Sequence, residues 1–296
     1  MLKMRAWAAA GTLAAGLGIH PASPPVNELS LQLPEPIGQE ATATVGDDDT
    51  LLDMAVRSGV GFEALARLNP ELDVWMPPVG IRVPLPTRMI PPNAPTTGLV
   101  VNVPEMRLYD YTQPGPPRIY PIAVGDSTTP SPISERRIRW KTIDPTWRVP
   151  ESIRAERPWL PAEVPPGEDN PLGRYWLDLG DGYGIHGTNN LWSIGRVATH
   201  GCIRLHDSQI ERLYEDVPVG TPVHIVYQTI KLGRSGQDLY LEAHPDLYEL
   251  TRAPFAHALV HLLILGLLDD VDRALVERTI EEARGVPVWI GRATSS

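Results

Sequence analysis

The sequence contains a single cysteine, Cys202, among its 296 residues. One thiol excludes internal disulfides, zinc sites built on two or more thiolates, and iron–sulfur clusters. It does not exclude an oxidising compartment, because such a compartment permits disulfides without requiring them. The thiol therefore serves either packing or chemistry.

Basic residues are also few. Lys and Arg number 26 against 36 for Asp and Glu, which gives a formal net charge of −10. Because nucleic-acid binding leaves a basic footprint in the composition, this balance predicts no nucleic-acid partner. The hydrophobic fraction of 42% is sufficient for ordinary cores and excludes disorder throughout. The length corresponds to about two domains at roughly 150 residues each.

Proline and glycine, by contrast, are abundant, with 32 and 25 residues. This content favours turns and short strands over a helical bundle, so the sequence predicts a mainly β protein. Short β-branched or aromatic segments punctuated by Pro or Gly predict a sandwich or barrel. These segments are residues 99–103, 106–111, 119–124, 138–143, 175–179, 183–186 and 222–227.

The amino terminus has the pattern of an export signal. Lys3 and Arg5 precede an apolar run over residues 6–19, and small residues and prolines follow the run. The run is shorter than the about 20 apolar residues of a membrane helix. The pattern predicts a signal peptide over residues 1–22, with a short uncleaved anchor or a disordered tail as the alternatives.

Two proline-rich stretches divide the chain that follows. Residues 23–41 predict an extended linker, and residues 87–98 predict a hinge. Between them, the apolar spacing of residues 42–86 predicts the order strand, helix, helix, strand. Residues 144–173 form a proline-rich loop that is too long for an ordinary connection, so this loop is expected to be functional or poorly ordered.

Helical spacing returns near the carboxyl end, where residues 231–296 are predicted to form a helical extension. Asp269 or Asp270 is expected to cap one of its helices. The apolar run over residues 258–268 is too short for a membrane span and predicts a buried core helix.

Two histidines are candidate bases for Cys202. A nearby imidazole can take the thiol proton, which predicts a lowered thiol pKa, and can later return the proton to a leaving amine. His186 ends an apolar strand, and the carbonyl of Gly187 can accept from its second ring nitrogen. His200 lies two residues from Cys202, on the same face of an extended chain. The amides of Gly201 and Cys202 can serve as an oxyanion hole.

Structural alternatives exist for these residues. A lone cysteine is usually packed in a core, and so are isolated histidines. A metal site from His200, Cys202 and His206 lacks the four-ligand spacing of structural zinc, so no metal and no cofactor is predicted. His206 is instead expected to precede a helix that a capping box of Ser208 and Glu211 begins.

The motif HGT at residues 186–188, followed by THGCIRL at residues 199–205, resembles the signature of the L,D-transpeptidase catalytic domain. The resemblance covers residues 99–230 and implies a β-sandwich domain. It also implies that Cys202 is the nucleophile, that His186 is the base, and that the backbone oxygen of Gly187 orients the base. His200 and Gly201 then have auxiliary or oxyanion-side roles.

Arg204, inside the same motif, would organise the site or meet a substrate carboxylate, since a guanidinium can bind a carboxylate through two hydrogen bonds. The other candidates for substrate contact are Trp147, Arg148, Thr199, Trp159 and Trp192. Aromatic packing is the alternative for each tryptophan.

Residues 42–86 resemble a lysin-motif (LysM) module, which implies affinity for the glycan strands of peptidoglycan. The matching positions are Gly46, Thr50, Leu51, Ala55, Gly59, Leu65, Asn69, Gly80, Val83 and Pro84. Asp48 and Asp49 depart from the family pattern, because they split its usual Gly-Asp-Thr turn. A small α+β spacer is the alternative.

Together, the resemblances imply a periplasmic enzyme that acts on peptidoglycan stem peptides and that a carbapenem would acylate. Cys202 would attack the carbonyl at the L-centre of a diamino-acid residue, and D-alanine would leave. The acceptor stays open: a second stem would give a 3→3 cross-link, a lysine of an outer-membrane lipoprotein would give anchoring, and water would make the protein an L,D-carboxypeptidase. A non-catalytic peptidoglycan-binding protein is the alternative of another class.

Overall fold

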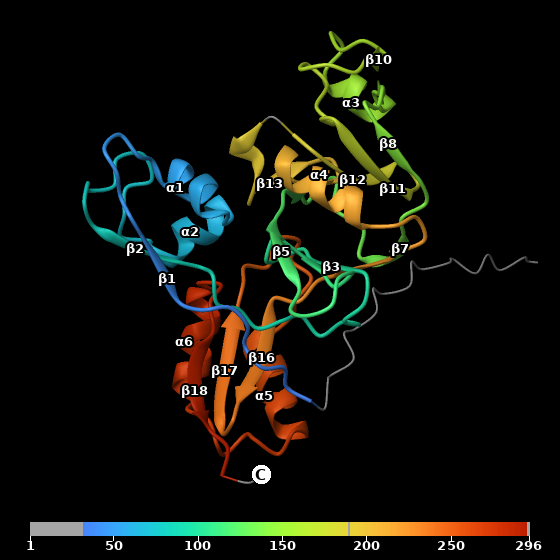
Figure 1. Ribbon diagram of the computed structural model, residues 1–296. Helices are drawn as coiled ribbons and strands as arrows, with labels where there is room; N and C mark the ends of the chain where they lie inside the picture. Colours follow the sequence, from blue (N-terminus) through green and yellow to red (C-terminus); the bar gives the residue numbers. More distant parts are fainter. Residues whose placement is uncertain (1–31, 189, 295–296) are drawn as a thin grey trace, which may run out of the picture.

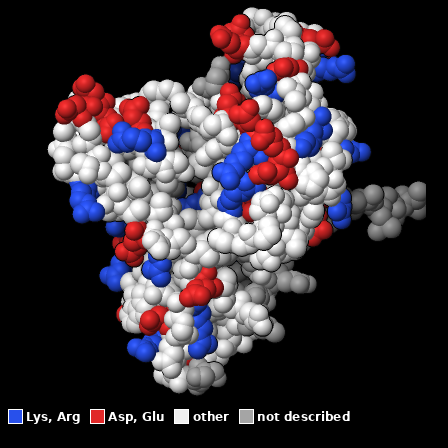
Figure 2. Space-filling view, viewed as in Figure 1, with Lys and Arg blue, Asp and Glu red and all other residues white. Residues whose placement is uncertain are grey.

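The computed structural model describes residues 32–188 and 190–294 (Figure 1). The predicted signal peptide, residues 1–22, lies outside the described residues, as does the first part of the predicted linker. Figure 1 shows a central β-rich body, an amino-terminal lobe in blue and cyan, a carboxyl-terminal lobe in orange and red, and a lid that carries α3 (Glu151–Glu156) and β10 (Glu163–Val164). Figure 2 shows that charges of both signs are interspersed on the face it displays.

The amino-terminal lobe has the predicted order of strand, helix, helix, strand. Its elements are β1 (Ala41–Thr44), α1 (Leu51–Ser58), α2 (Phe62–Leu68) and β2 (Arg82–Leu85), and the two strands pair antiparallel. Thr50 caps α1, because its hydroxyl accepts from the Asp53 amide at 3.1 Å. The additional Asp49 stabilises the first turn, since its carboxylate accepts from the Gly46 amide at 2.6 Å and from Arg57 at 2.7 Å.

The central body is the predicted sandwich. One sheet has the order β5-β4-β3-β15-β7 and the other β14-β12-β11-β8. The strands of the first sheet are β3 (Leu99–Asn102), β4 (Arg107–Asp110), β5 (Arg118–Pro121), β7 (Ser134–Arg137) and β15 (Pro222–Val226). Those of the second are β8 (Lys141–Ile143), β11 (Tyr175–Gly180), β12 (Tyr183–His186) and β14 (Ile203–Arg204). A separate parallel pair joins β6 (Val124–Gly125) to β13 (Val197–Thr199).

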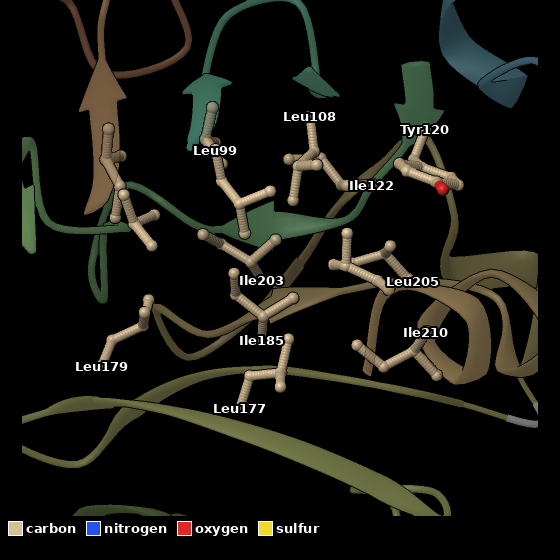
Figure 3. Close-up of a cluster of buried hydrophobic side chains, with 14 of the residues drawn as sticks. Leu99, Leu108, Tyr120, Ile122, Leu177, Leu179, Ile185, Ile203, Leu205 and Ile210 are labelled. Carbon is tan, nitrogen blue, oxygen red and sulfur yellow. The ribbon is translucent and has the colours of Figure 1, made fainter. Parts of the chain in front are cut away.

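A single apolar core fills the space between the two sheets (Figure 3). Leu99 and Leu108 come from the first sheet, and Ile185 and Ile203 come from the second; all four are fully or almost fully buried. Helix α4 (Asp207–Asp216) closes this core with Ile210. Because side chains alternate along a strand, burial of Ile185 and Ile203 turns their neighbours toward the opposite face.

The two proline-rich stretches are packed against the body, so the prediction of a free linker and a hinge is wrong for the described residues. Ile37 pairs with Met89, and both join the cluster on the outer face of the first sheet. The Pro34 carbonyl accepts from the Arg234 amide at 2.9 Å. Prolines favour an extended backbone, and that backbone runs beside strands whose amides can pair with its carbonyls.

The carboxyl-terminal lobe is not the purely helical extension that the spacing predicts. It contains the antiparallel sheet β16-β17-β18, formed by β16 (Ile230–Ser235), β17 (Asp238–Ala243) and β18 (Val288–Arg292). Helices α5 (Pro254–Ile264) and α6 (Arg273–Glu282) pack on this sheet. The turn at Gly236, which has a φ of +58°, makes residues 230–243 a hairpin. The cap of α6 is Asp272, not Asp269 or Asp270.

Helix α5 is only half buried, contrary to the prediction of a core helix. Ala258 and Leu262 are buried, whereas Leu263 is 61% exposed and Val260 and Ile264 are about half exposed. Within the described part of the chain, no helix combines the length and apolar composition that a membrane span requires.

A buried charge cluster joins the body to the carboxyl-terminal lobe. It consists of Glu105, Arg107, Lys231, Glu242 and His244. The Lys231 ammonium lies 2.7 Å from Glu105 and 3.1 Å from Glu242, so it takes the place between the carboxylates that a metal cation would need. It also donates to the Ile90 carbonyl.

Candidate active site

The second sheet places the motif residues on one face. In the parallel pairing of β12 with β14, Ile185 lies opposite Ile203 and His186 opposite Arg204. The two isoleucines point into the core, so His186 and Arg204 point to the opposite face of the sheet. Cys202 precedes this pair in the loop that enters β14. Cys202, His186 and Arg204 all border one groove of about 1090 Å³.

The 144–173 segment covers this groove as an ordered lid. It contains β9 (Trp147–Arg148), α3 (Glu151–Glu156) and β10 (Glu163–Val164), and the two strands pair antiparallel. The Asn170 amide group donates to the carbonyls of Pro145, Val164 and Pro165 at 2.8–3.3 Å. These bonds hold the two ends of the lid together, so the lid is structured despite its prolines.

His186 has the geometry of a neutral base. Its Nδ1 lies 2.7 Å from the Gly187 carbonyl, and a carbonyl can only accept, so Nδ1 carries the proton and Nε2 keeps its lone pair. Burial, followed by the nearby Arg204 cation, lowers the pKa of His186 to about 3. A Cβ at Gly187 would lie 2.2 Å from Asp207 Oδ1, which explains why glycine occupies this position.

Cys202 is a neutral thiol in the resting protein. Burial raises its pKa above the usual range, although Arg204 acts in the opposite direction. The prediction of a lowered thiol pKa is therefore wrong, because removal from water penalises the thiolate more than Arg204 favours it. Both groups are consequently neutral at rest, and the Cys202 Sγ donates to the Gly182 carbonyl at 3.8 Å.

The turn before Cys202 depends on Gly201. Its φ is +96°, and a Cβ there would lie 2.7 Å from the ring of Tyr183. Thr199 donates from its hydroxyl to the Cys202 carbonyl at 2.6 Å, so this predicted substrate contact is engaged in holding the turn, although it borders the groove. Within the described residues, the Gly201 and Cys202 amides donate to no backbone carbonyl.

His200 and Arg204 are placed differently from His186. The Nε2 atom of His200 lies 3.4 Å from the Glu156 carboxylate, so His200 faces the last turn of α3 in the lid. Arg204 borders the groove, and its Nε has no hydrogen-bond partner among the described residues. Burial lowers the pKa of Arg204, but an arginine stays charged at neutral pH.

The other predicted contacts divide into two groups. Trp147 and Arg148 line the groove, and Arg148 also forms an exposed ion pair with Glu163 at 3.4 Å. Trp159 and Trp192 are absent from the groove lining. The sequence does not indicate on which surface of the protein an exposed tryptophan lies.

The start of α4 differs from the predicted capping box. His206 itself is the cap, because its Nδ1 accepts from the Ser208 amide at 3.2 Å. Glu211 instead accepts from the Tyr175 hydroxyl at 2.6 Å. His206 is therefore structural, as the capping argument expected.

Comparisons with known proteins agree with this geometry. The family model described as the L,D-transpeptidase catalytic domain (YkuD) matches residues 96–225. The "Probable L,D-transpeptidase ErfK/SrfK" of Salmonella typhimurium is 35% identical over 270 residues, which are 86% of this chain and 87% of that protein. The chain belongs to the L,D-transpeptidase family.

A second curated relative has a similar identity and coverage. The "Probable L,D-transpeptidase ErfK/SrfK" of Escherichia coli is 36% identical and covers 86% of this L,D-transpeptidase chain and 87% of its own length. Among solved structures, an Enterococcus faecium L,D-transpeptidase is 25% identical over 44% of this chain and 49% of its own, with a TM-score of 0.35.

Trp176 is a site residue that the L,D-transpeptidase motif does not contain. It lies opposite His186 in the β11–β12 ladder, and the two rings stack with centroids 5.8 Å apart. A Cβ at Gly184 would lie 2.3 Å from the indole, so the glycine leaves room for the ring. The Asp181-Gly182 pair is a hairpin signal that could have given this register, but a bulge near Gly180 shifts it by one residue.

Replacement of Trp176 by alanine should move the acid limb of Cys202 acylation to higher pH by about one unit or more. The indole shields His186 from water, so its removal weakens the burial that lowers the His186 pKa, while the Arg204 cation stays. The acylation rate measured from pH 4 to 8 checks this. Trp176→Phe keeps an aromatic ring and should keep the wild-type profile; equal profiles for the alanine variant and wild type would contradict the role.

Proposed function

We propose that the protein transfers the acyl group of a peptidoglycan tetrapeptide stem through Cys202. The observation that carries the proposal is the His186–Gly187 contact, which fixes the Nδ1–H tautomer of an imidazole on the sheet face that borders the groove with Cys202. Membership of the L,D-transpeptidase family supplies the substrate class.

The reaction begins from the neutral pair. As Sγ of Cys202 bonds to the carbonyl carbon at the L-centre of the diamino-acid residue, Nε2 of His186 takes the thiol proton. The imidazolium then donates this proton to the nitrogen of D-alanine as the C–N bond breaks. An acceptor amine attacks the resulting thioester, His186 takes its proton, and the proton returns to the departing sulfur.

Two further groups act on the charge that develops. The Gly201 and Cys202 amides, which have no carbonyl partner among the described residues, can donate to the oxyanion. Arg204 borders the groove and binds a carboxylate of the substrate, because a guanidinium can pair with a carboxylate through two hydrogen bonds. Trp147 and Arg148 contact the stem from the lid, whereas His200 acts through the lid contact to Glu156.

Residues 42–86 act as a LysM-like module that binds glycan strands. Support comes from the order of its elements and from the capped first turn, which Asp49 stabilises. Because the substrate is a wall polymer, we place the protein outside the cytoplasmic membrane, in the periplasm.

The function is tested with a purified disaccharide tetrapeptide. Wild-type protein should release D-alanine and form either a 3→3 cross-linked dimer, a conjugate with an added lipoprotein lysine peptide, or a tripeptide, and mass spectrometry of the products identifies the acceptor. Cys202→Ser should release none. A folded wild type that releases no D-alanine with any acceptor would favour the non-catalytic binding protein.

A further inference from the structure

An exposed pair of tryptophans lies where the amino-terminal lobe meets the body. Trp75 comes from the α2–β2 loop and is 56% exposed. Trp192 comes from the 3₁₀ turn at Leu191–Ser193 and is 51% exposed. Their ring centroids are 5.7 Å apart, with 34° between the planes. Tryptophan is enriched at binding surfaces, and two adjacent exposed indoles form a patch rather than a single exposed side chain.

Local hydrogen bonds order the two turns that carry the tryptophans. The Asp73 carboxylate accepts from the Trp75 amide at 2.8 Å and from the Met76 amide at 3.1 Å. On the other side, the Ser193 hydroxyl donates to the Asn190 carbonyl at 2.7 Å. These bonds order the two backbone segments from which the indole rings project.

Close contacts also fix the two lobes relative to each other at this point. The Glu63 amide donates to the Gly195 carbonyl at 3.2 Å, and the Arg196 guanidinium stacks on the Phe62 ring at 4.0 Å. A Cβ at Gly195 would lie 2.4 Å from the Gly61 Cα, so glycine is required for this approach. The pair is consequently a preorganised surface rather than a chance meeting of side chains.

We propose that Trp75 and Trp192 form one saccharide-binding site that spans both lobes and holds the sugar rings of a glycan strand. The apolar C–H face of a pyranose ring packs on an indole face, and two adjacent indoles can contact neighbouring rings. The proposal rests on the proposed function for one step, which is that the strand held here carries the stem peptide that reaches Cys202.

The position of Trp192 favours this occupant. Trp192 is outside the lining of the catalytic groove, but it follows two residues that line it, Thr188 and Asn190, so the chain leads from the groove directly to the tryptophan pair. A peptidoglycan substrate has its glycan and its peptide joined covalently. A surface that binds sugar next to a groove that binds peptide therefore raises the effective concentration of the stem at the site.

The experiment uses the full chain and glycan strands from which the stem peptides have been removed. Trp75→Ala and Trp192→Ala should each weaken binding about tenfold or more, as measured by calorimetry. The double variant should lose less binding free energy than the sum of the losses in the two single variants, because both rings contact the same ligand. Trp159→Ala is the matched control, since Trp159 is 77% exposed on the lid and outside this pair; its affinity should equal that of the wild type.

A second readout separates binding from catalysis. Release of D-alanine from a sugar-free tetrapeptide should be unchanged in both variants, whereas release from glycan-linked stems should fall. Wild-type affinity for the stripped glycan in both variants would overturn the proposal, as would an equal loss on the sugar-free peptide, or binding to phospholipid vesicles in place of glycan. If the wild type releases no D-alanine from any stem, the proposed function fails, but the affinities for stripped glycan still decide the saccharide site.

Discussion

His186→Ala should slow acylation of Cys202 by a β-lactam reporter by about 10² to 10⁴-fold, close to the inactivity of Cys202→Ser. The loss is large because the resting thiol is neutral and its pKa is raised, so it needs a base at the moment of attack. Single-turnover fluorescence of the reporter measures the rate constant directly.

His200→Ala is the matched comparison and should lose much less. His200 faces Glu156 of the lid, and no carbonyl contact fixes its tautomer among the described residues. If the His200 variant were the more damaged while both variants stayed folded, His200 would be the base and His186 the supporting group.

Lys231→Met should destabilise the protein by about 3–5 kcal/mol, because it leaves Glu105 and Glu242 buried with less positive charge nearby. Lys231 is almost fully buried, so water cannot replace the ammonium. At about 2–4 °C per kcal/mol for a chain of this size, the melting temperature should fall by about 10 °C in a thermal scan.

Arg273→Ala is the control that tests whether loss of any ion pair in this lobe lowers the melting temperature as Lys231→Met does. Its pair with Asp269 is exposed, and exposed pairs contribute about 0–1 kcal/mol, so the melting temperature should hardly change. Equal melting temperatures for Lys231→Met and wild type would contradict the role of the buried charge cluster.

The same cluster makes the free energy of unfolding depend on pH. Lys231 and the other cations of the cluster lower the Glu105 pKa to about 2 and lower that of Glu242, despite burial that acts in the opposite direction. The unfolded chain therefore binds more protons as the pH falls below about 4.5, and this part of the stability is lost between there and about pH 2. Denaturant titrations should therefore give a smaller free energy of unfolding at pH 3 than at pH 7.

Local patterns in the sequence predicted much of the fold. The short β-branched or aromatic segments 99–103 and 183–186 predicted β3 and β12, and the helical spacing of residues 51–68 predicted α1 and α2. Segments 119–124 and 138–143 were less successful, because the first is divided between β5 and β6 and only the end of the second is β8. The hairpin of β16 and β17 was not predicted, because the helical spacing near the carboxyl end belongs to α5 and α6 and does not extend to the strand that begins at Ile230.

For the site, too, contacts between residues close in the sequence could be predicted, whereas contacts that depend on the folded sheet could not. The motif residues are close in the sequence, so the contact between His186 and Gly187 could be predicted from two adjacent positions. Trp176 reaches His186 only through a strand register that contains a bulge. Burial, which determines the charge of His186 and Cys202, depends on the folded lid and sheet and has no local signal.

Intact-protein mass spectrometry after incubation with a carbapenem tests the central claim, that Cys202 is the nucleophile. The wild type should gain the mass of one carbapenem, peptide mapping should place it on Cys202, and folded Cys202→Ser should gain none. A folded wild type that stays unmodified, or a serine variant that still acquires the adduct, would contradict the assignment.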